Sequence, residues 1–158
     1  MEPIKSISGI RGIVGKTLTE KHVEDFVHVF CLTKSPGKLL IGRDTRLTGK
    51  TLLESAAREI SMHKHTDVDI CGIIPTPTGQ FLVQKHKYAG GIIFTASHNP
   101  SEWNGMKFID RDGCFINQDR LNEMLDQYPP TRIDSVLSKM DAWGKINKIN
   151  DPIKEHID

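Results

Sequence analysis

The sequence carries almost no net charge and contains no long apolar run. Its 21 lysines and arginines nearly balance 20 aspartates and glutamates, which leaves a formal charge of +1. So small a charge does not attract nucleic acid or a membrane surface, and any bound anion must be held by a local cluster of groups. No stretch approaches the roughly 18 apolar residues of a membrane-spanning helix, and residues 1–5 lack the apolar core of a signal peptide. We therefore expect a cytoplasmic protein without nucleic-acid or membrane partners.

Paired cysteines are also missing. Cys31, Cys71 and Cys114 are odd in number and form no CxxC pair. Disulfides are rare in the reducing cytosol, so we interpret all three as reduced thiols. The seven histidines show no ligand spacing that matches these cysteines. The sequence therefore gives no reason to expect a zinc site.

The apolar residues that are present recur with the spacing of alternating helices and strands. The chain is 37% hydrophobic and 26% charged, which is typical of a soluble globular domain. Thr19 can cap a helix, since the residues after it follow the i, i+3, i+4, i+7 pattern of an apolar helix face. That helix carries Val23, Phe26, Val27 and Phe30, later helices begin near Thr48 and Pro77, and strands are predicted at 39–41, 68–74 and 88–95.

This order of elements predicts the fold class. Strands that alternate with helices are typical of parallel pairing through right-handed crossovers. Further along, apolar segments at 106–110 and 114–116 flank Arg111-Asp112-Gly113, a composition that favours the tight turn of a hairpin. We therefore predict a three-layer α/β/α domain with a mixed, mostly parallel sheet and a late antiparallel hairpin.

The C-terminal part predicts two more helices and a domain boundary. A helix capped by Asp119 and a helix at 133–143 are separated by Tyr128-Pro129-Pro130, which breaks helical structure. Residues 147–158 begin another helical pattern at Pro152, and that pattern stops before two full turns. We interpret residues 1–146 as one domain and 147–158 as the truncated lead-in to a second; a frayed polar terminus is the alternative.

The most informative stretch is an apolar strand that runs directly into a small polar loop. Residues 90–94 are followed by Thr95-Ala96-Ser97-His98-Asn99-Pro100. Ligands of open α/β sheets gather outside the carboxyl ends of strands, so Ser97 lies where a reacting group is expected. His98 and Asn99 add hydrogen-bonding capacity. The alternative is a purely structural turn, for which serine and asparagine are common residues.

A phosphorylated Ser97 needs cations nearby, because phosphoserine carries about −1.5 to −2 charge at neutral pH. Lys107, His98 and Arg11 are the candidates. Arg11 is predicted in a loop between two glycines, whose backbone amides can approach an anion closely. The attacking hydroxyl also needs a base, and either the lysine or the adjacent histidine can accept its proton.

These residues resemble the phosphoserine signature of the α-D-phosphohexomutases, the phosphoglucomutase/phosphomannomutase family. The resemblance begins with the segment from Thr95 to Pro100 and continues through Asn104-Gly105-Met106-Lys107. It covers residues 4–116 closely and the rest loosely. Three further segments match in the family's order, namely Ser6-Ile7-Ser8-Gly9-Ile10-Arg11-Gly12, Gly42-Arg43-Asp44-Thr45-Arg46 and Pro75-Thr76-Pro77-Thr78.

The resemblance implies the phosphoserine domain of an intramolecular phosphotransferase. Such an enzyme interconverts hexose 1-phosphate and hexose 6-phosphate through a bisphosphorylated sugar, with glucose or mannose 1,6-bisphosphate as activator. Ser97 would carry the phosphoryl group, and a phosphoryl oxygen would be a ligand of Mg²⁺. Lys107 and His98 would be acid/base candidates with Arg11 beside them, and Arg11, Asn99 and Lys107 would bind phosphate.

The sequence also departs from the family's pattern. The Asp-Gly-Asp-x-Asp metal motif of the family's second domain does not occur here. The resemblance therefore implies that hexose phosphate is bound together with the remaining domains of a longer parent chain, and that the isolated chain is inactive as a mutase. The alternatives are a stand-alone, non-catalytic phosphate-binding module and a domain of a phosphoglucosamine mutase, a branch that more often has serine in place of Thr95.

Two interpretations remain open for Arg43, Asp44 and Arg46. They can take part directly in catalysis, or they can form an ion-pair network that braces the domain. We favour the bracing interpretation.

Overall fold

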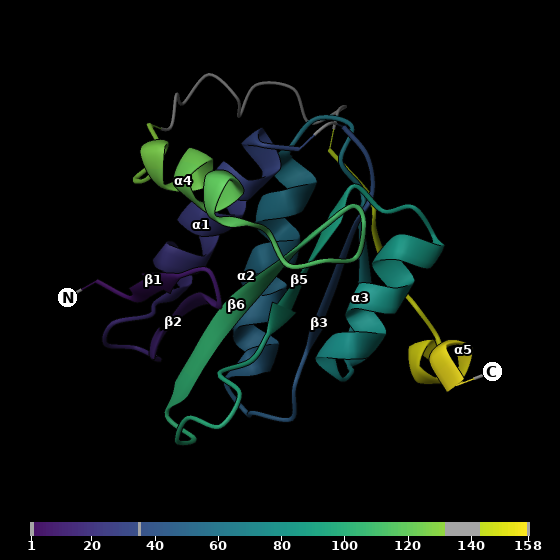
Figure 1. Ribbon diagram of the computed structural model, residues 1–158, viewed down its shortest axis with the longest axis horizontal. Helices are drawn as coiled ribbons and strands as arrows, with labels where there is room; N and C mark the ends of the chain where they lie inside the picture. Colours follow the sequence, from purple (N-terminus) through teal and green to yellow (C-terminus); the bar gives the residue numbers. More distant parts are fainter. Residues whose placement is uncertain (1, 35, 132–142, 158) are drawn as a thin grey trace.

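The chain folds around one sheet with helices on both faces. The computed structural model describes residues 2–34, 36–131 and 143–157 (Figure 1). No helix in these ranges is long and apolar enough to cross a membrane. The strands are β1 (Ile4–Ser6), β2 (Gly9–Ile13), β3 (Leu39–Arg43), β4 (Val68–Ile73), β5 (Gly90–Phe94), β6 (Trp103–Asp110) and β7 (Ile146–Lys148), and the helices are α1 (Glu20–Leu32), α2 (Gly49–Met62), α3 (Thr76–Lys85), α4 (Gln118–Asp126) and α5 (Pro152–Ile157).

The sheet confirms the predicted α/β class with a mixed sheet. Its seven strands lie in the order β1-β2-β6-β5-β3-β4-β7. The half formed by β5, β3, β4 and β7 is parallel, as the helical crossovers predict. The half formed by β1, β2, β6 and β5 is antiparallel. The antiparallel share is therefore larger than the sequence pattern indicates. The pattern predicts one hairpin, whereas the sheet contains two, β1 with β2 and β5 with β6.

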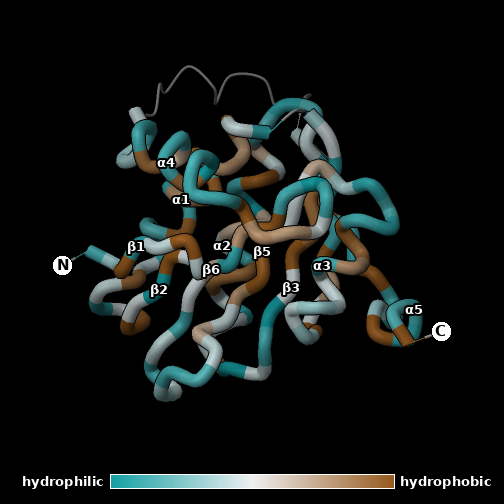
Figure 2. The backbone as a smooth tube through the Cα atoms, in the orientation of Figure 1, coloured by the Kyte–Doolittle hydropathy of each residue, from teal (hydrophilic) through white to brown (hydrophobic). Residues whose placement is uncertain are grey.

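Two hydrophobic clusters hold the three layers together. The larger one lies under α1, α2 and α4 and contains Phe26, Phe30, Phe94 and Phe108. The smaller one lies under α3 on the opposite face. Figure 2 shows the hydrophobic residues gathered along the central strands β5 and β3. This double cover explains why these strands read as continuous apolar runs in the sequence.

The principal hairpin differs from the predicted one. Strands β5 and β6 pair antiparallel, so the connection between them is the loop that carries Ser97. The predicted turn at Arg111-Asp112-Gly113 exists, but the chain beyond it makes only a single bridge, between Ile109 and Phe115. The segment 114–116 is too short after that turn to extend the sheet. The residues around Gly113 thus predict the turn and the late antiparallel element correctly, although that element is a single bridge and the longer antiparallel pairing is the one between β5 and β6.

The segment around Arg11 also differs from its prediction. The flanking glycines predict a loop, whereas β1 and β2 form a hairpin that turns at Ile7 and Ser8, with Gly9 and Arg11 inside β2. Gly9 has a φ of +118°, and a Cβ at this position would lie 2.4 Å from the carbonyl oxygen of Met106. Only glycine fits there, so the glycines that suggest a flexible anion loop instead permit close strand packing.

The C-terminal elements are partly as predicted. Helix α4 begins two residues earlier than expected, since Asn117 and not Asp119 is its N-cap and accepts a hydrogen bond from the Arg120 amide at 2.9 Å. The helix predicted at 133–143 falls almost wholly outside the described residues. Helix α5 begins at Pro152 as expected. Strand β7, which spans the proposed boundary at 146/147, pairs in parallel with β4.

A buried carboxylate joins β7 to the sheet. Asp69 on β4 accepts hydrogen bonds from the Tyr88 hydroxyl at 2.6 Å and from the Asn147 side-chain amide at 2.9 Å. Lys38 lies 3.3 Å from the same carboxylate. Burial raises the pKa of Asp69, but the hydrogen bonds from Tyr88, Asn147 and Lys38 together outweigh it and hold the pKa below its ordinary value. The charged form of Asp69 therefore stabilises the folded chain.

We expect Tyr88→Phe to lower the free energy of unfolding by about 1.5–3 kcal/mol near neutral pH, the usual contribution of a hydrogen bond to a charged group. A depressed carboxyl pKa gives stability that is present above the unfolded pKa of about 3.9 and is lost as the pH falls below it. The difference between the two proteins should therefore shrink as the pH falls through that value. Urea unfolding at a series of pH values measures it.

Tyr128→Phe is the matched control. The Tyr128 hydroxyl donates to Glu2 at 3.2 Å at an exposed position, where the loss of a hydrogen bond costs little because water replaces the partner. Equal destabilisation by the two substitutions would contradict the role assigned to the buried Asp69.

Candidate active site

Ser97 lies on the loop between β5 and β6, at the carboxyl end of β5 where the sequence places it. Its side chain is exposed and its backbone has a φ of 55°, a left-handed conformation that is unfavourable for a residue other than glycine. The Ser97 amide donates a hydrogen bond to the Thr95 hydroxyl at 3.0 Å. The Asn99 side chain closes the turn by donating to the Ala96 carbonyl at 2.8 Å. The loop therefore holds an exposed hydroxyl on a strained backbone, a combination typical of functional sites.

The side chain of Arg46 fixes this loop in place. Its Nη2 donates to the carbonyls of Ser97 and Asn99, both at 2.8 Å. Its Nη1 donates to the carbonyls of Pro100, at 2.7 Å, and Trp103, at 3.1 Å. One planar guanidinium thus satisfies four backbone acceptors, which a lysine cannot do because it lacks the rigid fork of donors.

Asp44 orients this arginine. Its carboxylate accepts hydrogen bonds from the Arg46 backbone amide at 2.9 Å and from Arg46 Nε at 3.1 Å. Arg43 donates to the Asp44 carbonyl at 3.0 Å and so shapes the same turn. These contacts agree with the bracing interpretation of the three residues. The structure adds that the braced segment is the Ser97 loop itself, which lies more than 50 residues further along the chain.

Asn104 and Gly105 support the loop from β6. The fully buried Asn104 side chain donates to the Thr48 hydroxyl at 3.0 Å and accepts from the Gly105 amide at 2.8 Å. A Cβ on Gly105 would lie 2.6 Å from the Ile10 carbonyl oxygen and 3.1 Å from that of Thr95. The asparagine and the glycine are thus needed because strand β2, the start of α2 and the Ser97 loop converge on this point.

Arg11 and Lys107 lie on one face of the adjacent strands β2 and β6. Arg11 is paired with Gly105, and Ile10 with Met106, so Arg11 and Lys107 are diagonal neighbours across the strand pair. Both side chains are half-buried, and Lys107 Nζ lies 5.2 Å from the centre of the Phe115 ring. Because Gly105 has no side chain between them, the two cations share this part of the sheet, next to the end of the hairpin that carries Ser97.

The remaining predicted residue is His98. His98 is exposed, and within the described chain no hydrogen bond or ion pair joins the Ser97 side chain to His98, Lys107 or Arg11. An open groove of about 690 Å³ lies beside Ser97 and Asn99. Residues 44–48, Ser101 and Glu102 form the rest of its lining. The structure therefore displays Ser97 at an open surface and places Arg11 and Lys107 outside the lining of this groove.

The contacts of Arg46 with the Ser97 loop are not evident from the sequence. The Arg46 donors lie just after β3, and their four acceptors lie far along the chain, on the Ser97 loop and at the first residue of β6. No spacing rule connects the two segments. The local signal is the neighbouring Asp44, which is compatible with any surface ion pair.

We expect Arg46→Lys to loosen the Ser97 loop while it preserves the charge at this position. Lysine cannot satisfy four carbonyls at once, so hydrogen exchange of the Ser97 and Asn99 amides should accelerate by at least about tenfold, which corresponds to roughly 1.4 kcal/mol of local stability. Arg58→Lys is the matched control, since Arg58 makes one exposed ion pair with Glu20 at 3.6 Å. Unchanged exchange in the loop of the Arg46 variant would show that the clamp is dispensable.

Comparison with known proteins agrees with this geometry. Residues 4–131 match the family described as phosphoglucomutase/phosphomannomutase, alpha/beta/alpha domain I. The phosphoglucosamine mutase of Prochlorococcus marinus subsp. pastoris is 39% identical over 125 residues, which are 78% of this chain and 27% of that protein. The phosphoglucosamine/phosphogalactosamine mutase of Sulfurisphaera tokodaii is 35% identical over 135 residues, 81% of this chain and 28% of that protein.

Solved structures share the fold. The putative phosphomannomutase of Thermus thermophilus superposes with a TM-score of 0.78 at 24% identity, over 95% of this chain and 33% of that one. The chain thus spans about a quarter to a third of the length of the relatives it matches. It belongs to the phosphoglucomutase/phosphomannomutase family, of which it contains the α/β/α domain I.

Proposed function

We propose that this chain supplies the phosphoryl-carrying serine of a phosphosugar mutase. The observation that carries the proposal is the conformation of Ser97. Its exposed hydroxyl stands at the carboxyl end of β5 on a backbone with positive φ, and Arg46 holds that backbone through four carbonyls. Positive φ also occurs at His65, Lys87 and Asp151, but at Ser97 it is combined with the Arg46 clamp. A nucleophile that must meet a phosphate in one orientation benefits from that combination.

In the proposed reaction Ser97 exchanges a phosphoryl group with the sugar. The Ser97 oxygen attacks the phosphorus, the bond from phosphorus to the sugar oxygen breaks, and the serine proton passes to a base while the sugar oxygen takes up a proton. Lys107 and His98 are the candidates for these proton transfers. Arg11 and Lys107 offset the charge of the resulting phosphoserine, and Asn99 keeps the loop in shape. This step follows an earlier one, in which phosphorylated Ser97 donates its phosphoryl group to the free hydroxyl of the hexose phosphate and gives a bisphosphorylated sugar. Removal of the phosphoryl group at the other end of that sugar then completes the isomerisation and phosphorylates Ser97 again.

The residues of this chain fit Mg²⁺ only in part. Mg²⁺ prefers about six oxygen ligands in octahedral geometry. Phosphorylated Ser97 offers phosphoryl oxygens, but the nearby Asp44 carboxylate already binds the amide and Nε of Arg46. The other ligands therefore have to come from outside this chain, and the ion would supply charge neutralisation once they are present.

The substrate class we propose is a hexose phosphate, with an amino sugar phosphate as the first member to test. The relatives from Prochlorococcus marinus and Sulfurisphaera tokodaii are named for phosphorylated amino sugars, whereas the Thermus thermophilus structure is named a putative phosphomannomutase. Since the chain covers only about a third of these proteins or less, sugar recognition is expected to depend on the other domains of a longer parent. The isolated chain should then show no mutase turnover.

A domain exchange tests the proposed function directly. This chain would replace the corresponding segment of the Prochlorococcus marinus phosphoglucosamine mutase, and interconversion of glucosamine 1-phosphate and glucosamine 6-phosphate would be measured. We expect turnover that falls by at least about 10⁴-fold in Ser97→Ala, as for the loss of a covalent nucleophile. Thr131→Ala, a change to an exposed hydroxyl residue outside the groove, should leave the rate unchanged. Turnover that survives Ser97→Ala would refute the nucleophile assignment.

A second test uses the chain by itself. Phosphoserine introduced at position 97 should have a second phosphate pKa below the ordinary value of about 6, because Arg11 and Lys107 favour the dianion. Phosphoserine at position 101 is the control, and Lys107→Ala should raise the value at position 97. A ³¹P NMR titration measures each pKa. Equal values at the two positions would mean that the predicted cations do not reach the phosphoryl group.

A further inference from the structure

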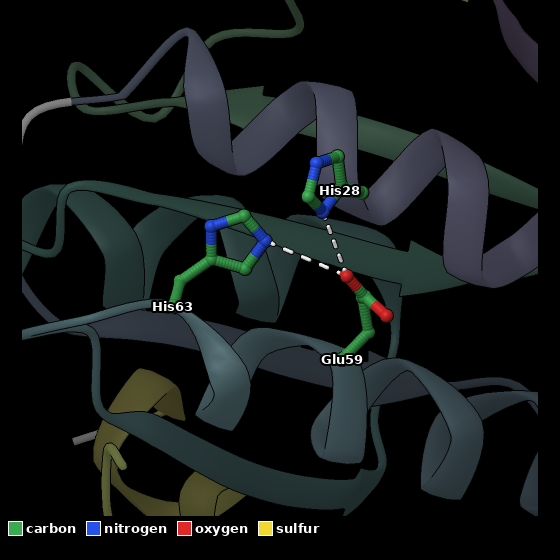
Figure 3. A group of neighbouring side chains, drawn as sticks. All are labelled: His28, Glu59 and His63. Atoms are coloured by element: carbon green, nitrogen blue, oxygen red, sulfur yellow. Dashed lines mark hydrogen bonds and ion pairs between the residues drawn. The ribbon is translucent and has the colours of Figure 1, made fainter. Parts of the chain in front are cut away.

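Three side chains that can bind a metal meet between α1 and α2. Figure 3 shows His28 on α1 and Glu59 on α2, with His63 just beyond the end of α2, all turned toward one point. Among the described residues they are the one group of this kind whose potential ligand atoms converge, all within 4.8 Å of one another. The separation of 31 residues between His28 and Glu59 hides this group from any motif search.

The distances around Glu59 are close to those of a coordination sphere. Its Oε1 lies 2.9 Å from Nδ1 of His28 and 3.5 Å from Nε2 of His63. Two ligands of a tetrahedral zinc ion with bonds of 2.0–2.1 Å stand roughly 3.3 Å apart. The two measured separations bracket this value. The two imidazole rings, whose centres are 4.7 Å apart, would turn so that one nitrogen of each faces the bound ion, and all the ligand atoms already lie within 4.8 Å of one another.

Burial makes the group unusual for a surface ion pair. The Glu59 side chain is only 3% exposed, and those of His28 and His63 are 22% and 15% exposed. Nε2 of His63 is itself buried and makes no hydrogen bond, since its contact with the Glu59 carboxylate at 3.5 Å is longer than a normal one. A buried nitrogen without a partner costs free energy, and native structures rarely keep one without a reason such as an ion or a functional role.

We propose that His28, Glu59 and His63 form a binding site for a transition-metal ion of the zinc class. Two neutral imidazoles and one carboxylate are the donor set that zinc and its neighbours prefer, whereas Mg²⁺ and Ca²⁺ require oxygen ligands. The three side chains occupy three positions of a tetrahedron and leave the fourth to water. The ion gives the buried nitrogen of His63 a partner at bonding distance and places a positive charge beside the carboxylate of Glu59.

The position of the site indicates a stabilising role. Helix α2 begins beside the Ser97 groove and extends for 14 residues, about 20 Å at the usual rise. Glu59 and His63 lie at its far end, so the ion is remote from the phosphoryl chemistry and does not depend on it. It cross-links α1 to α2. These helices already contact each other through a hydrogen bond that the Ser55 hydroxyl donates to the Glu24 carboxylate at 3.1 Å. An ion that binds only the folded chain raises its stability in proportion to the logarithm of the ion concentration.

The test uses untagged chain freed of metal with a chelator. Isothermal titration with Zn²⁺ should show one ion per chain, Co²⁺ should give the visible absorption of a tetrahedral complex, and saturating Zn²⁺ should raise the melting temperature. His28→Gln and His63→Gln should each weaken binding by at least about 10- to 100-fold, the loss that is typical even of partners outside the coordination sphere. Absence of saturable binding, or unchanged affinity in both variants, would overturn the proposal.

A neighbouring histidine provides the matched control. His65 is exposed, with a φ of 60° that asparagine tolerates, so His65→Asn should bind Zn²⁺ as the unaltered chain does. A second readout avoids dependence on variants that fail to fold. In ¹⁵N spectra of the unaltered chain, Zn²⁺ should shift the imidazole nitrogens of His28 and His63 and leave those of His65 in place. Shifts confined to other histidines would show that the ion binds elsewhere.

Discussion

The geometry of the candidate active site depends on one guanidinium that holds four carbonyls. The loop between β5 and β6 turns the backbone oxygens of Ser97, Asn99 and Pro100 toward a single point, where that of Trp103, the first residue of β6, joins them. Four partial negative charges so close together repel one another unless a cation with several donors lies between them. Arg46 meets that requirement because its fork is planar and permanently charged. The backbone of Ser97 can then stay in a left-handed conformation that it would otherwise leave.

The pairing of the strands brings the two parts of this clamp together. Antiparallel pairing of β5 with β6 makes the Ser97 loop a hairpin connection, and parallel pairing of β5 with β3 places the end of β3, and hence Arg46, beside it. Pairing of β2 with β6 then carries Arg11 onto the same strand pair as Lys107. The mixture of parallel and antiparallel strands is therefore what assembles residues from three parts of the chain. A wholly parallel sheet would send the chain after β5 into a helix and away from Lys107.

Stability and chemistry are supported at different places in the fold. The carboxyl ends of β3 and β5 hold an open groove with an exposed serine and a strained backbone, features that cost stability. The compensating interactions lie elsewhere, in the two hydrophobic clusters and in the buried carboxylates of Asp69 and Glu59. Each carboxylate adds a polar link between neighbouring elements. Asp69 joins β7 to β4 through Asn147, and Glu59 joins α1 to α2 through His28.

Local patterns in the chain suffice to predict most of its helices, its central strands and the candidate nucleophile. Apolar periodicity predicts α1, α2, α3 and the three central strands, since a helix face or a doubly covered strand imposes its own spacing. The polar loop directly after β5 likewise marks Ser97. Packing of the layers, by contrast, determines that Arg11 lies in a strand and that Arg46 binds the Ser97 loop. It also determines that His28 lies beside Glu59 and His63. These contacts join residues that are distant along the chain, and their geometry follows from how sheet and helices pack, which no local pattern encodes.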